Sequence, residues 1–180
     1  MEATKTLGLI INPIAGMGGK VALKGTDGEK ILAAARDRGA VPESAAKAER
    51  ALKALVPYRS GLLIRTASGA MGETLCRKLG LPCEVVYQAG ETTSAADTVA
   101  AAAAIRDKGA ALLLFAGGDG TARNICEAVG GKFPVLGIPA GVKIQSAVFA
   151  LHPESAGFIA AKIAQNIHMS MRRSWVSRGS

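Results

Sequence analysis

The stretch Ala111-Leu-Leu-Leu-Phe-Ala-Gly-Gly-Asp-Gly-Thr121 decides the predicted fold. Residues 111–116 are apolar throughout, which is typical of a central parallel strand that helices cover on both faces. The glycines that follow allow a tight turn, and a helix is predicted from about Ala122 to Val129. A buried strand is therefore expected to end in a glycine-rich loop that leads directly into a helix.

Short apolar runs alternate with helical patterns along most of the chain. Ser94 and Asp97 fit a capping box at the start of an Ala-rich helix. The order of elements predicts an α/β fold: a doubly wound, mostly parallel, Rossmann-like sheet with helices on both faces. The other predicted strands are 7–11, 62–66, 84–87 and 134–138, and the other predicted helices include 29–38, 42–55, 73–79 and 153–167.

The rim at the carboxyl ends of these strands is the expected ligand site, because ligands bind there in doubly wound sheets. Gly117-Gly118-Asp119-Gly120-Thr121 is the first candidate, since residues without Cβ let backbone N–H groups approach a ligand. The following helix presents further unpaired N–H groups and its positive dipole end to the same place, which favours phosphate. Four loops should gather on this rim, after Ile11, Thr66, Ala116 and Ile138.

Asp119 is the candidate catalytic residue. A carboxylate beside phosphates is repelled unless it has a task, and it can bind Mg²⁺ through water or accept a proton from an attacking hydroxyl. Thr121 can cap the following helix, donate to a phosphate, or do both. The alternative interpretation is an ordinary Asp-Gly turn. The strand before the loop and the helix after it favour the phosphate site.

The loop after the first strand, with Asn12, Pro13 and Gly16, is a second candidate contact. It is neither a dinucleotide fingerprint nor a Walker A loop, because Val21 stands where each pattern needs another residue type. A structural turn and a ligand loop remain equal alternatives here.

The loop after the last predicted strand is a third candidate contact. It contains Gly137, Pro139, Ala140, Gly141 and Lys143. Lys143 either pairs with a phosphate or is solvated, and the Gly and Pro residues are equally consistent with a plain turn.

Composition narrows the function classes. The chain has 180 residues and a net charge of +8, which suits one domain with an anionic partner. No dense basic run with interleaved aromatics supports nucleic-acid binding, and no apolar run approaches the roughly 20 residues of a membrane span. Three cysteines without metal-pair spacing are expected to be free thiols, and Cys76 and Cys126, which fall on predicted helices, are expected to be buried. Small nucleotides are the expected partners and the cytoplasm the expected compartment; a homo-oligomer stays open.

The motifs resemble those of the superfamily that joins NAD kinases with diacylglycerol and sphingosine kinases. Gly117-Gly118-Asp119-Gly120-Thr121 matches its shared GGDGT motif, and Asn12-Pro13-x-x-Gly16 resembles its first-strand loop. Together with Gly137-Ile-Pro-Ala-Gly-Val-Lys143, these stretches look like the ATP-NAD-kinase-like branch, which includes proteins resembling acetoin-catabolism protein X. The resemblance covers about residues 7–167.

The resemblance implies transfer of a phosphoryl group from ATP, with Mg²⁺, to the 2′-hydroxyl of the adenosine ribose of NAD. Asp119 would act as the general base, and Gly117, Gly118, Gly120 and Thr121 would hold nucleotide phosphates. Family members continue into a β-rich second domain. Residues 1–168 are therefore expected to form the nucleotide-binding domain, and 169–180 an irregular tail that is the truncated start of the second. The alternatives are a non-catalytic nucleotide-binding or regulatory domain and a kinase of another hydroxyl acceptor, such as a lipid.

Overall fold

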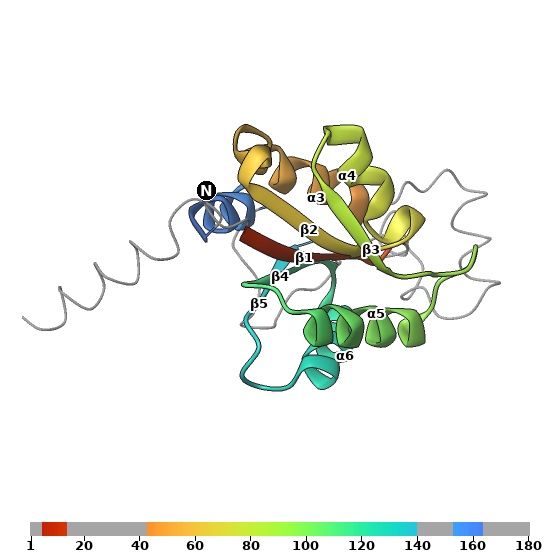
Figure 1. Cartoon of the computed structure of the whole chain (residues 1–180). Helices are drawn as coiled ribbons and strands as arrows, with labels where there is room; N and C mark the ends of the chain where they lie inside the picture. Colours follow the sequence, from red (N-terminus) through yellow and green to blue (C-terminus); the bar gives the residue numbers. More distant parts are fainter. Residues whose placement is uncertain (1–4, 14–42, 140–152, 164–180) are drawn as a thin grey trace, which may run out of the picture.

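Five parallel strands form one sheet in the order β3-β2-β1-β4-β5. The computed structural model describes residues 5–13, 43–139 and 153–163 (Figure 1). The parallel pairing and the strand order confirm the predicted doubly wound sheet. The strands are β1 Lys5–Ile11, β2 Leu62–Ala67, β3 Cys83–Tyr87, β4 Leu113–Gly117 and β5 Val135–Pro139.

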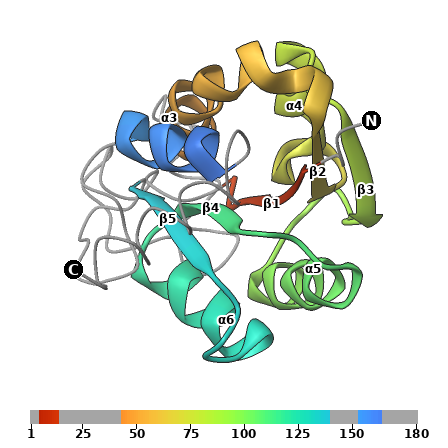
Figure 2. The ribbon, with the colours of Figure 1, turned by 60° about the vertical axis from the view of Figure 1, so that its left-hand side comes forward.

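Helices cover both faces of this sheet, as Figures 1 and 2 show from two directions. On one face lie α3 (Glu43–Leu52), α4 (Glu73–Leu79) and the helix of residues 153–163; on the other lie α5 (Ala95–Lys108) and α6 (Asp119–Val129). Two 3-10 segments, η1 (Lys53–Gly61) and η2 (Gly69–Met71), complete the described part. In that part of the chain, no helix is long and apolar enough to cross a membrane.

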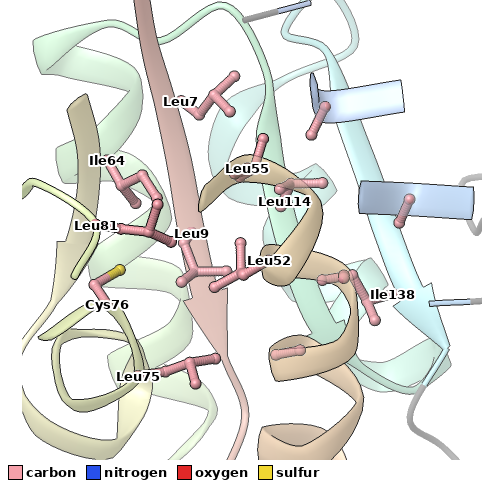
Figure 3. Close-up of a cluster of buried hydrophobic side chains, with 14 of the residues drawn as sticks. Leu7, Leu9, Leu52, Leu55, Ile64, Leu75, Cys76, Leu81, Leu114 and Ile138 are labelled. Atoms are coloured by element: carbon pink, nitrogen blue, oxygen red, sulfur yellow. The ribbon is translucent and has the colours of Figure 1, made fainter. Parts of the chain in front are cut away.

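Aliphatic side chains fill the space between the sheet and α3, α4 and the 153–163 helix (Figure 3). Leu9 projects from the central strand β1 and Leu114 from its neighbour β4, and Leu52 meets them from α3. These side chains are almost completely removed from water, so their burial contributes about 25 cal/mol per Å² of apolar surface. The packing holds α3 against the centre of the sheet.

The opposite face is packed by α5 and α6 around Ile10 and Phe115. Gly8 permits this packing, because a Cβ at that position would lie 2.7 Å from Ile105 Cγ2 and 2.8 Å from Leu113 Cδ1. The predicted capping box starts α5: the backbone N–H of Ser94 donates to Asp97 Oδ2 at 2.8 Å.

Two predicted helix boundaries were wrong. The helix expected over 42–55 ends at Leu52 and continues as η1, which contains Pro57; proline lacks the N–H that an α-helix needs at that point. The helix expected from Ala122 begins at Asp119 instead, with Gly118 as its N-cap. Of the predicted helix 153–167, residues 153–163 are helical and the rest lies outside the described residues, as does 29–38.

The cysteines differ in exposure. All three are free: Cys76 is buried, whereas Cys83 and Cys126 are half-buried. The expectation of a buried thiol on both helices therefore holds for Cys76 and is wrong for Cys126. Burial, with the neighbouring Cys83, raises the pKa of Cys76 to about 12.

Candidate functional site

The candidate site lies where β1 and β4 run side by side at the centre of the sheet. Ile11 is paired with Ala116, and the backbone N–H of Asn12 donates to the carbonyl oxygen of Ala116 at 2.9 Å. From β1 the sheet continues to β2 and β3 on one side, and from β4 to β5 on the other. This junction is the switch point of a doubly wound sheet, outside which ligands bind.

A side-chain hydrogen bond joins the two loops across this junction. Asn12 Nδ2 donates to Thr121 Oγ1 at 2.9 Å, and the two residues are 109 positions apart in the sequence. This bond joins the Asn-Pro loop and the Gly-Gly-Asp-Gly-Thr loop into one structural unit. Pro13 follows Asn12 directly and favours extended backbone at Asn12.

Gly117 allows the close approach of Thr121. A Cβ on Gly117 would lie 2.4 Å from Thr121 Oγ1 and 2.7 Å from Thr121 Cβ, closer than real Cβ atoms come. Gly120, in contrast, is exposed and has open space around it. The first glycine is therefore required by the protein's own packing, and Gly120 is not.

The first turn of α6 faces the rim. Its earliest helical hydrogen bond in the described structure runs from the Ala122 N–H to the Gly118 carbonyl oxygen at 3.0 Å. The N–H groups of Gly120 and Thr121 come before this bond in the first turn, where backbone N–H groups have no i−4 partner within the helix. Aligned N–H groups at the start of an 11-residue helix favour an anion at this place.

Asp119 and Thr121 occupy different environments in this turn. Asp119 is the first residue of α6 and is half-buried, whereas Thr121 is 4% exposed. The interpretation of Thr121 as a helix cap was wrong: Gly118 holds the cap position, and Thr121 lies inside the first turn with its hydroxyl oxygen bonded to Asn12.

Ser44 is a residue of this site that the sequence did not reveal. It lies in the first turn of α3, is fully buried, and donates from Oγ to the carbonyl oxygen of Asn12. A serine near a helix start is an unremarkable local pattern, and only tertiary structure brings it to a loop 32 residues earlier.

The third candidate loop is only partly described. Gly137 is buried within β5 opposite Phe115, and Pro139 ends that strand opposite Gly117. Pro139 thus lies at the carboxyl end of the strand next to β4, on the predicted rim. Gly16, Ala140, Gly141 and Lys143 lie outside the described residues.

A second polar network lies at the same rim, beyond β3. Tyr87 donates from its hydroxyl to Asp97 Oδ1 at 2.7 Å. This bond and the Ser94 backbone N–H lower the pKa of Asp97, and the carboxylate raises the pKa of Tyr87. The network ties the end of β3 to the start of α5.

The ligand chemistry of the site is that of an anion-binding turn. Among the residues with described positions, no group of three or more His, Cys, Asp or Glu side chains is arranged to hold a metal ion. A magnesium ion that keeps several waters and binds substrate phosphates needs only one or two carboxylates, and the carboxylate in the first turn of α6 is that of Asp119.

Comparison with known proteins agrees with this geometry. The family model described as the ATP-NAD kinase N-terminal domain matches residues 7–167. The match includes both loops that meet at the β1–β4 junction. No curated protein matches the chain.

Proposed function

The chain belongs to the family of the ATP-NAD kinase N-terminal domain, and we propose that it acts as a NAD-kinase-like phosphotransferase that uses ATP to phosphorylate the 2′-hydroxyl of NAD. One observation carries the proposal: the bond between Asn12 and Thr121, which joins the two family-like motifs at the switch point of the sheet. That is where a doubly wound sheet binds nucleotides.

Phosphate binding follows from the first turn of α6. The N–H groups of Gly118, Gly120 and Thr121 and the dipole of the helix would contact phosphate oxygens. Gly120, which is exposed and surrounded by open space, would let a phosphate approach the backbone. Asn12, Pro13 and Pro139 would border the nucleotide. Gly137, Gly16, Ala140, Gly141 and Lys143 complete the proposed set of contacts.

Asp119 is the proposed general base. The oxygen of the 2′-hydroxyl of NAD would attack the γ-phosphorus of ATP while the bond from that phosphorus to the β,γ-bridging oxygen breaks and ADP leaves. The proton of the hydroxyl would pass to the Asp119 carboxylate. Mg²⁺ bound with ATP would neutralise phosphate charge, which also removes the repulsion between Asp119 and the phosphates.

The decisive experiment is formation of NADP. The protein is incubated with ATP, Mg²⁺ and NAD, and NADP is measured with a NADP-specific dehydrogenase, while ADP affinity is measured by calorimetry. We expect ADP binding and NADP formation together. ADP binding without NADP would leave a nucleotide-binding domain and overturn the kinase proposal; phosphorylation of another hydroxyl compound but not NAD would overturn the acceptor.

A further inference from the structure

We propose that Ser44 is a positioning residue of the phosphate site, acting through Asn12 to set the direction in which the Thr121 hydroxyl donates its hydrogen bond. The inference rests on the proposed function. It concerns a chain of three groups: the Ser44 hydroxyl, the Asn12 backbone and amide, and the Thr121 hydroxyl.

The backbone of Asn12 is held on both sides. Its N–H donates to the Ala116 carbonyl at 2.9 Å, and its carbonyl accepts from Ser44. With both backbone groups bonded, the starting point of the Asn12 side chain is fixed relative to β4. Ser44 is fully buried and Asn12 is half-buried, so loss of the Ser44 hydroxyl would remove a part-buried hydrogen bond from the Asn12 carbonyl.

Ser44 is itself carried by a rigid element. Ala48 and Leu52 of α3 are fully buried against the sheet. Beside α3 on the same face of the sheet, the 153–163 helix packs so closely that a Cβ on Gly157 would lie 2.0 Å from the Ala51 carbonyl oxygen. Because α3 is packed against both the sheet and this neighbouring helix, the position of Ser44 relative to Asn12 is set by the core.

The direction of donation follows from the chemistry of the groups. A hydroxyl has one proton and two acceptor lone pairs. The Asn12 amide nitrogen donates to Thr121 Oγ1, so the threonine oxygen is the acceptor in that bond and keeps its own proton for another acceptor. A phosphate oxygen can only accept a hydrogen bond, so the Thr121 hydroxyl is left with a proton that it can donate to a nucleotide phosphate.

The test is a double-mutant cycle on ADP affinity, measured by calorimetry on the full chain. The variants are Ser44→Ala, Thr121→Val and the two combined. Thr66→Val is the matched control, because Thr66 is also fully buried and its hydroxyl also donates to a β1 carbonyl, that of Leu9, at 2.8 Å. Each variant is also unfolded with urea to compare stability.

We expect Ser44→Ala to weaken ADP binding about three- to tenfold, the range for loss of one intramolecular hydrogen bond, and Thr66→Val to leave binding unchanged. The double variant should bind ADP about as weakly as Thr121→Val alone, because both substitutions break the same chain of hydrogen bonds from Ser44 through Asn12 to Thr121. Multiplicative losses, or equal losses in Ser44→Ala and Thr66→Val, would overturn the role of Ser44 and leave the proposed function standing. A wild-type chain that does not bind ADP would overturn both.

Discussion

Asn12 Nδ2 lies 2.9 Å from Thr121 Oγ1, so the loop that ends the first strand is bonded directly to the first turn of the helix after the fourth. Each loop alone has an alternative interpretation as a turn. Their bond lies at the switch point, where doubly wound sheets bind ligands, and beside a helix start of the kind that favours anions.

Asn12→Asp should weaken ADP binding strongly. The substituted carboxylate has nearly the same shape, but it cannot donate to Thr121 and it places a negative charge beside the phosphates. Bonds to charged groups contribute about 1.5–3 kcal/mol, so a loss of roughly ten- to a hundredfold in affinity is expected. Calorimetric titration checks this, with Asn12→Leu as the uncharged comparison, for which a smaller loss is expected. Wild-type affinity in Asn12→Asp would refute the role of Asn12.

Two glycines of the same loop should respond to alanine in opposite ways. Gly117→Ala places a Cβ against Thr121 and should lower the free energy of unfolding by about 1–3 kcal/mol, as overpacking does. Gly120→Ala meets open space inside a helix and should raise it by about 0.5–1 kcal/mol. Urea unfolding of both variants decides; equal stability of the two would contradict the close packing of Gly117 against Thr121.

The bond between Tyr87 and Asp97 should make part of the stability dependent on pH. Because the folded state lowers the pKa of Asp97 below its ordinary value of 3.8, the bond stabilises the fold above that pH and is lost as the pH falls through the lower, folded value. Tyr87→Phe should therefore melt below the wild type at pH 6, and the gap should close toward pH 2. A gap that is constant with pH would show that the carboxylate is not involved.

The contact between Gly157 and α3 should tolerate no side chain. In Gly157→Ala the new Cβ meets the Ala51 backbone, so the 153–163 helix must move away, at a cost of about 1–3 kcal/mol. Urea unfolding measures the loss. Ser155→Ala, on the same helix, serves as the control and should change stability by only a few tenths of a kcal/mol.

Most of the fold could be predicted from periodicity and turn residues. The all-apolar run before Gly117 predicted β4 within two residues, and the Ser94–Asp97 pair predicted the start of α5. The start of α6 was missed because the first turn of a helix needs no i−4 partner, so Asp119 and Gly120 can be helical despite their turn preference. The position of the N-cap, here Gly118, therefore sets where α6 begins.

The candidate site was only half predictable. Parallel strands bring the loops after Ile11 and Ala116 to one rim, and the register of β1 with β4 makes them neighbours. Ser44 could not be found in this way, because its contact with Asn12 depends on how α3 packs across the sheet. Local sequence patterns carry no information on a hydrogen bond between residues that lie 32 positions apart.

The rate of NADP formation by Asp119→Asn, compared with the wild type at saturating ATP and NAD, tests the central proposal most directly. Asparagine keeps the size of the side chain but cannot accept the proton of the attacking hydroxyl, so we expect the rate to fall about 10²–10⁴-fold while ADP affinity and the melting temperature are retained. A variant that forms NADP at the wild-type rate would contradict the role of Asp119 as general base.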